Sequence, residues 1–124
     1  WRGPSASLLD RGALRLIDLV TTEEILTELE SVLSRPHLVE RLRLRGQTVA
    51  GVMQTYRAVA QIVAPVQVES PAALRDLKDL HVLRCAVGAN ADAIVTGDKD
   101  LLVLEEFENI PIVTPRQFLA SIGM

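Results

Sequence analysis

Residues 93–102 have the sequence Ala93-Ile94-Val95-Thr96-Gly97-Asp98-Lys99-Asp100-Leu101-Leu102. The apolar start of this stretch predicts a short buried strand, and Gly97 predicts the turn that ends it. Asp98 then lies just beyond the carboxyl end of the strand. In open parallel sheets this end borders the ligand-binding crevice, so a carboxylate here is a candidate ligand for a metal ion.

Helical and strand patterns alternate along the whole chain, which is typical of an α/β fold. The strand patterns cover residues 16–20, 65–68, 93–95 and 110–113. The helical patterns cover residues 4–14, 23–33, 37–44, 47–63 and 79–87, and a last helix is expected from Pro115. An α/β unit usually begins with a strand, whereas the first pattern here is a helix. We therefore expect the sheet to be one strand short and a further strand to lie just upstream of Trp1.

The composition sets limits on the class of protein. A chain of 124 residues is one ordinary domain, and 48% hydrophobic residues are enough to form a core. No apolar run approaches the roughly 20 residues of a membrane span. Only 3% of the residues are aromatic, which argues against nucleic-acid binding by base stacking. The single cysteine, Cys85, cannot form an internal disulfide, and a reducing cytoplasm is the expected location.

The charged residues are unevenly distributed. The net charge of −3 is not typical of a nucleic-acid binder, whose surface is usually basic. One segment nevertheless concentrates positive charge, at Arg35, Arg41, Arg43 and Arg45. Two interpretations stay open for this segment, a surface for a polyanion such as RNA and a solvated helix face.

Several acidic residues are candidate metal ligands. On the helix predicted at 23–33, Glu28 lies at the margin of the apolar face, where a carboxylate is costly unless it is paired or metal-bound. An ordinary salt bridge is the favoured explanation for Glu28 alone. Asp79 and Asp76 stand near a predicted helix start and Asp100 precedes a turn, so helix capping is an alternative for each of them.

Together these carboxylates indicate a hard divalent cation. Mg²⁺ prefers oxygen ligands, and two to four carboxylates without cysteine suit it. Zinc is disfavoured, because Cys85, His37 and His81 lack the spacing of zinc ligands. A cation held in this way lowers the pKa of a bound water and stabilises the charge on a phosphodiester.

Four stretches of the chain resemble the PIN-domain ribonucleases, which include the VapC-like toxins of toxin–antitoxin pairs. The motifs are Thr21-Thr22-Glu23-Glu24-Ile25-Leu26-Thr27-Glu28-Leu29, Arg75-Asp76-Leu77-Lys78-Asp79-Leu80-His81-Val82-Leu83, Val95-Thr96-Gly97-Asp98-Lys99-Asp100-Leu101-Leu102 and Ile110-Pro111-Ile112-Val113-Thr114-Pro115. Glu28, Asp79 and Asp98 match the acidic positions of the family, and Asp76 is a near neighbour. The resemblance runs over residues 1–124 as a single domain.

The resemblance implies a three-layer α/β/α fold with a small parallel sheet, and Mg²⁺- or Mn²⁺-dependent endonucleolytic cleavage of RNA. It implies Glu28, Asp79 and Asp98 as catalytic metal ligands, with Asp100 or Asp76 adding a further carboxylate. It also implies a protein antitoxin and a homodimer as partners. The first motif of the family, a strand ending in Asp-Thr-Asn, is expected just before Trp1, so the domain is expected to be N-terminally incomplete.

Two other functions are considered. A catalytically silent PIN-like module would act by binding an antitoxin, RNA or its own copy. A phosphatase of the haloacid-dehalogenase type is disfavoured, because its early Asp-x-Asp motif is missing here and its second late acid lies further along than Asp100.

Overall fold

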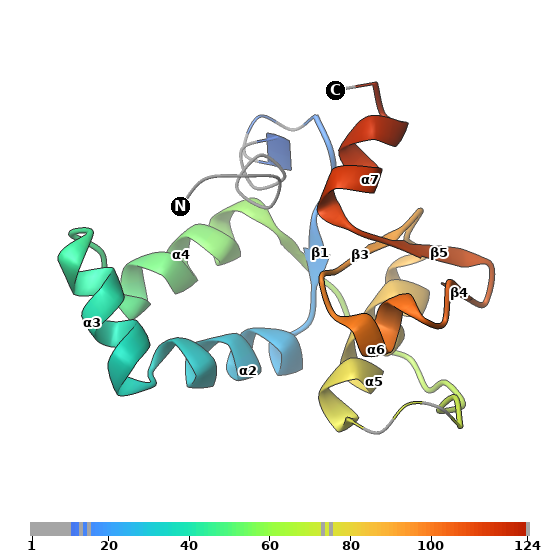
Figure 1. The fold of residues 1–124 in the computed structure, drawn as a ribbon, viewed down its shortest axis with the longest axis horizontal. Coiled ribbons are helices and arrows are strands. Elements are labelled where there is room, and N and C mark those ends of the chain that lie inside the picture. The colour runs from blue at the N-terminus through green and yellow to red at the C-terminus, as the bar shows by residue number, and fades with distance from the viewer. Residues whose placement is uncertain (1–10, 13, 15, 73, 75, 124) are drawn as a thin grey trace.

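The computed structural model describes residues 11–123, apart from residues 13, 15, 73 and 75. The helices are α2 (Glu23–Leu33), α3 (Pro36–Leu44), α4 (Val49–Val59), α5 (Leu77–Ala89), α6 (Lys99–Leu102) and α7 (Pro115–Ser121). The strands are β1 (Val20–Thr21), β2 (Gln61–Ile62), β3 (Ile94–Val95), β4 (Glu106–Phe107) and β5 (Ile110–Val113). Helices and strands are arranged as Figure 1 shows, and the predicted α/β fold is confirmed.

Within the described residues the strands form two separate sheets. β1 pairs in parallel with β2, so that Val20 lies opposite Gln61. In the other sheet β5 lies between β3, which is parallel to it, and β4, which is antiparallel. Helix α5 packs against both β1 and β3. One helix therefore supports both sheets.

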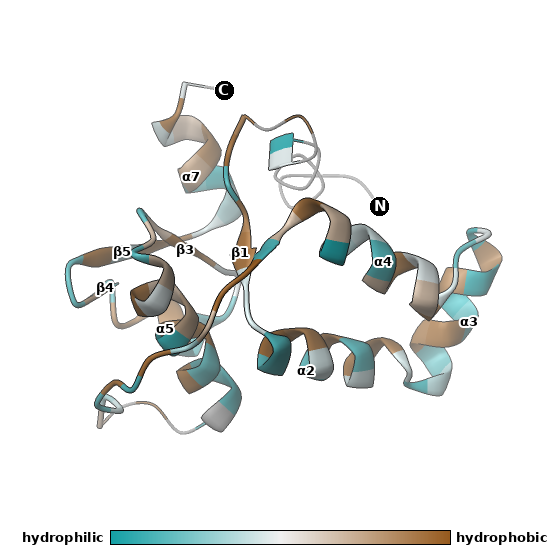
Figure 2. Cartoon of the chain, turned by 180° about the vertical axis from the view of Figure 1, so that it is seen from behind, coloured by the Kyte–Doolittle hydropathy of each residue, from teal (hydrophilic) through white to brown (hydrophobic). Residues whose placement is uncertain are grey.

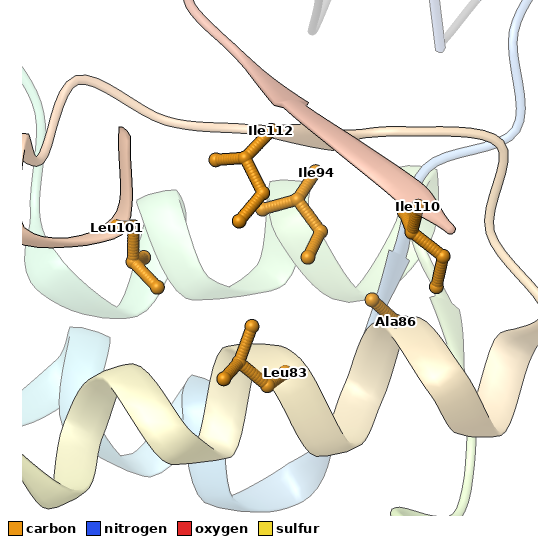
Figure 3. Close-up of a cluster of buried hydrophobic side chains, with 6 residues drawn as sticks. All are labelled: Leu83, Ala86, Ile94, Leu101, Ile110 and Ile112. Atoms are coloured by element: carbon orange, nitrogen blue, oxygen red, sulfur yellow. The ribbon is translucent and has the colours of Figure 1, made fainter. Parts of the chain in front are cut away.

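The main core lies between α5 and the sheet that contains β3. Leu83 and Ala86 lie on one face of α5, since residues three apart in a helix are neighbours. Figure 3 shows these side chains facing those of the adjoining strands and α6, namely Ile94, Ile110, Ile112 and Leu101. This aliphatic core holds the carboxyl end of β3 over the beginning of α5.

Side-chain oxygens cap the N-termini of two of the longer helices. At the start of α2, the buried hydroxyl of Thr22 accepts a hydrogen bond from the backbone N–H of Ile25 at 3.2 Å. At the start of α5, Oδ1 of Asp76 accepts the N–H of Lys78 at 3.0 Å. Asn90 ends α5 with φ 52°, a left-handed conformation that asparagine tolerates better than most residues. These caps satisfy backbone groups that would otherwise lack partners.

Helices α2, α3 and α4 form an arm that extends from β1 (Figure 1). Figure 2 shows polar and apolar residues interspersed along these helices, with apolar residues on β1 and on the chain after α4. Arg57 of α4 and Glu23 of α2 form an exposed ion pair at 3.0 Å. Such exposed pairs stabilise a protein by less than about 1 kcal/mol, so the apolar contacts between α2 and α4 matter more.

Several predicted elements differ from the structure. The strand expected at 16–20 is β1 at Val20–Thr21, and the helix expected at 47–63 ends at Val59. Residues 61–62 form β2 instead, because the N–H groups of Gln61 and Val63 bond the carbonyls of Leu19 and Thr21 at 2.8 Å. Pairing with a distant segment thus overrides the local helical pattern.

Other differences concern the remaining connections. Residues 65–68 were expected to form a strand, but they have no regular structure, and Pro65 has no N–H to donate to a sheet. β4 was not predicted. The helix expected at 4–14 lies mainly outside the described residues. In the part of the chain that the structure describes, no helix is both long enough and apolar enough to span a membrane.

Candidate metal centre

Three carboxylates meet where α5 begins and β3 ends. Asp79, Asp98 and Asp100 each offer one oxygen, and these oxygens all lie within 4.8 Å of one another. Asp79 is buried, with 6% of its surface exposed, whereas Asp98 and Asp100 face solvent. The group is therefore open on one side and enclosed on the other. This arrangement is suited to a cation that keeps some of its water ligands.

Asp98 and Asp100 are positioned by a chain of local hydrogen bonds. The backbone N–H of Asp98 donates to the hydroxyl of Thr96 at 3.0 Å. Asp98 is the N-cap of α6, and its Oδ1 accepts the N–H of Asp100 at 2.9 Å. One oxygen of Asp98 is thus bound to the backbone, and its orientation fixes the direction of the other. The predicted place of Asp98, beyond the carboxyl end of β3, is confirmed.

Asp79 enters the group from the first turn of α5. Its Oδ2 is fully buried and has no hydrogen-bond partner within the described residues. A buried carboxylate oxygen without a partner is costly, and a bound cation removes that cost. The orphaned oxygen and the all-oxygen donor set therefore fit Mg²⁺ or Mn²⁺.

The neighbouring acids change the protonation of Asp79. Burial raises the pKa of Asp79 to about 6, and the nearby carboxylates of Asp98, Asp76 and Asp100 add to this effect. Burial disfavours the charged form by removing water, a side-chain hydrogen bond between Asp79 and Asp98 favours the protonated form, and the neighbouring acids repel the like charge. A cation bound among these acids would offset the repulsion between their negative charges. The raised pKa of Asp79 is thus the electrostatic signature of a site that attracts positive charge.

Glu28 and Asp76, the other predicted ligands, have other partners. Glu28 Oε1 lies 2.5 Å from Nδ1 of His81, and both side chains are about three-quarters buried. Asp76 is the N-cap of α5, which is the capping role considered as an alternative for it. Glu28 contacts α5 through His81, which follows Asp79 by two positions. The structure thus brings Asp79, Asp98 and Asp100 together, whereas Glu28 pairs with His81.

The His81–Glu28 contact is the feature that the sequence analysis missed. His81 was considered only as a histidine without zinc-ligand spacing, and the salt bridge favoured for Glu28 was not connected with it. The two residues are 53 positions apart, so no local pattern connects them. Only the packing of α2 on α5 brings them into contact.

The predicted basic segment lies on α3. Arg35 is the N-cap of α3, Arg41 and Arg43 lie in its last turn, and Arg45 is its C-cap. All four side chains are exposed, and Arg43 pairs with Glu40 at 2.6 Å. Figure 1 shows α3 at the far end of the arm, well away from α6. The arginines and the acidic group are therefore separate features.

Comparisons with known proteins agree with this geometry. The family model described as PIN domain matches residues 2–100. No curated protein and no solved structure matches the chain. PIN domains form a nuclease superfamily that acts on RNA and generally uses divalent metal ions. Since the match covers most of the sequence, including Glu28, Asp79 and Asp98, this chain belongs to the PIN-domain family.

Proposed function

We propose that this chain is the catalytic domain of a Mg²⁺- or Mn²⁺-dependent endoribonuclease. The single observation that supports this most is the buried, unpartnered Oδ2 of Asp79, whose side chain belongs to a group of three carboxylates at the end of a strand. Asp79, Asp98 and Asp100 are the proposed ligands. Glu28, Asp79 and Asp98 are the proposed catalytic acids, and Asp76 is a further carboxylate near Asp79.

The residues have distinct tasks in this proposal. The cation, when bound, activates a water molecule and neutralises the negative charge that builds up on the phosphodiester. Asp98 is held in one orientation by the N–H of Asp100, so its free oxygen needs no rearrangement. Asp79 supplies a ligand from a site with little access for water. His81 contacts the carboxylate of Glu28 and would hold it in one position.

The proposal includes the partners of the protein. RNA is the substrate, and the exposed arginines of α3, Arg35, Arg41, Arg43 and Arg45, are proposed to contact its phosphates. A role as the toxin of a toxin–antitoxin pair in the cytoplasm, with an antitoxin and a homodimer as its assemblies, follows from the VapC-like motifs. This role is part of the proposal and depends on the nuclease activity.

The experiment is RNA cleavage with Mn²⁺ and with EDTA. Cleavage that EDTA abolishes is the expected result for the unsubstituted chain. Asp98→Asn is expected to reduce the rate by at least about 100-fold, since even residues that only support metal ligands change activity by 10–100-fold. Asparagine is as good an N-cap as aspartate, so the helix start should survive. The matched control is Asp92→Asn, which makes the same change at an exposed acid.

Three outcomes would contradict the proposal. The first is that cleavage is absent, the second that it persists in EDTA, and the third that Asp98→Asn acts no differently from Asp92→Asn. Calorimetry with Mn²⁺ alone then separates the alternatives. RNA binding without metal binding or cleavage would favour the silent binding module instead.

A further inference from the structure

Lysine is rare in this chain, and both lysines adjoin acids of the candidate metal centre. Among the 13 lysines and arginines only two are lysines, Lys78 and Lys99. Lys78 directly precedes Asp79, and Lys99 stands between Asp98 and Asp100. No arginine is next in sequence to any of these three acids. The basic residues that adjoin the centre in sequence are therefore all lysines.

Each lysine stands in the first turn of a helix that an aspartate caps. The backbone N–H of Lys78 donates to Oδ1 of Asp76, the N-cap of α5, at 3.0 Å. Lys99 is the first residue of α6 and directly follows the N-cap Asp98. Both lysines are exposed, whereas Asp79, one position after Lys78, is buried. The first turn of α5 therefore presents a carboxylate to the interior and an ammonium group to solvent.

Neither ammonium group is paired with an acid in the part of the chain that the structure describes. The ion pairs found there join arginine or histidine to glutamate. Neighbouring residues of a helix lie about 100° apart around its axis, so Lys78 and Asp79 do not face each other. The carboxylates of the centre are thus free to bind a cation, and the two ammonium groups are free to bind an anion.

The arginines of this protein behave differently toward carboxylates. Arg57 donates from both terminal nitrogens to the two oxygens of Glu23, and Arg43 binds both oxygens of Glu40. A guanidinium beside the metal centre would bind a carboxylate in the same bidentate way and compete with a cation for its oxygens. A lysine ammonium is a single point charge on a flexible stem and lacks this fork. Lysine therefore suits a position next to metal ligands.

The charge of the centre shows why a substrate would need these lysines. Three ionised aspartates carry three negative charges, and a divalent cation bound among them would leave one of these uncompensated. A phosphodiester brings one more negative charge, and two ammonium groups would balance both. The arginines of α3 do not supply this charge, because α3 lies at the far end of the arm from α6 (Figure 1).

Stability of α5 does not explain Lys78. The first turn of a helix is the positive end of its macrodipole, so a cation there is slightly unfavourable for the folded state. A bound anion would offset this repulsion. The position of Lys78 is therefore better explained by a ligand with negative charge than by helix formation.

We propose that Lys78 and Lys99 bind the phosphate of the RNA at the metal centre, one from each of the helices that supply its acids. This inference rests on the proposed ribonuclease function and assigns its substrate contacts. Consecutive Cα atoms are about 3.8 Å apart, so each lysine begins beside a proposed ligand and can donate to a phosphate oxygen there. Contacts to phosphate supply affinity and orientation without selecting a base sequence.

The test measures RNA binding separately from cleavage. A fluorescein-labelled oligouridylate is titrated with the whole chain in Ca²⁺, which also takes oxygen ligands and here replaces Mn²⁺, and a gel checks that the RNA stays intact. Lys78→Gln and Lys99→Gln are each expected to weaken binding by about three- to tenfold. Each should also reduce the slope of log affinity against log salt by about 0.7, the value for one phosphate contact on a single strand. Their unfolding midpoints should not fall, since glutamine is a good helix former.

Arg57→Gln is the matched control. It also removes one positive charge from an exposed helix position, but that charge is already paired with Glu23. Its RNA affinity and salt slope should equal those of the unsubstituted chain. Calorimetry with Mn²⁺ and no RNA should give the lysine variants an unchanged or tighter metal affinity, because each has lost a charge that repels the cation.

Two results would overturn the inference. One is that the lysine variants bind RNA as Arg57→Gln does. The other is that their Mn²⁺ affinity falls together with their RNA affinity, which would mean that the lysines arrange the acids. If either occurs while the unsubstituted chain cleaves RNA in an EDTA-sensitive way, the nuclease proposal stands and only the lysine contacts are refuted. Lysine-dependent RNA binding without any cleavage would refute the nuclease instead and keep the lysines as phosphate contacts.

Discussion

The burial of Asp79 predicts how the free energy of unfolding depends on pH. The pKa of Asp79 is about 6 in the folded protein, against 3.8 for an unperturbed aspartate. Between these pH values the folded state keeps a proton that the unfolded state has released. The free energy of unfolding should therefore fall as pH rises from about 4 to about 6, and this contribution should be constant above that range.

The magnitude follows from the size of the shift. A difference of about two pKa units corresponds to about 3 kcal/mol at neutral pH. Asp79→Asn removes the charge and keeps the shape of the side chain, and its amide can donate to the neighbouring carboxylates. The variant should match the unsubstituted protein near pH 4 and be more stable by up to about 3 kcal/mol at pH 8.

Urea unfolding in EDTA measures this difference. For a protein of this size, 3 kcal/mol shifts the unfolding midpoint by about 1–3 M urea. Comparison of the two proteins at each pH cancels the contributions of the other acids. The control is Asp92→Asn, an exposed site where no such pH-dependent difference is expected. A stability difference between Asp79→Asn and the unsubstituted protein that stays constant from pH 4 to pH 8 would refute the reasoning.

Mn²⁺ should remove most of the stability difference between the two proteins at pH 8. A ligand that binds only the folded state at 100 times its Kd adds about 2.7 kcal/mol of stability. The unsubstituted protein should gain this at pH 8, whereas Asp79→Asn, which has lost the buried ligand, should gain little. Equal stabilisation of both proteins by Mn²⁺ would show that Asp79 is not a metal ligand.

The remaining predictions concern packing and the His81–Glu28 contact. Gly88→Ala should lower the free energy of unfolding by about 1–3 kcal/mol, because its Cβ would lie 2.6 Å from the carbonyl oxygen of Ala64. Gly97→Ala, where nothing lies within 4 Å of the added Cβ, should be tolerated in the same urea titration, and equal losses would contradict this account. His81→Ala should lower the free energy of unfolding by about 1–3 kcal/mol in a urea titration, since it leaves the largely buried Glu28 without its partner. Unchanged stability would show that water replaces His81.

Local sequence patterns predicted the helices that are stabilised by their own caps and apolar faces. The helix at 23–33 was predicted with its correct bounds, because Thr22 is a strong cap and the apolar residues repeat at helical spacing. The closing helix was likewise predicted to begin at Pro115, and Thr114 forms a capping box with Gln117 at its start. β2 and β4 were not predicted, since two-residue strands exist only through pairing with distant partners. Local sequence carries no signal for such pairing.

The candidate site was likewise predicted only where neighbouring residues in the sequence determine it. The place of Asp98 followed from a strand and a turn that adjoin it in sequence. The burial of Asp79 and the pairing of Glu28 with His81 could not be predicted, because both depend on how α5 packs against α2, α6 and the sheets. Sequence indicated which acids to consider, and tertiary packing selected those that meet.

Capping and metal binding were treated as competing explanations for Asp76, Asp79 and Asp100, but Asp98 shows that they are compatible. Its Oδ1 caps α6 by accepting the N–H of Asp100, and this bond fixes the carboxylate plane. The same bond places Asp100 within the group of three acids. An N-cap therefore orients a ligand at no further entropic cost, because the side chain is already ordered. For that reason a capping role for an aspartate beyond a strand end is no evidence against metal binding, and Asp98→Asn separates the two by keeping the cap while removing a charged oxygen.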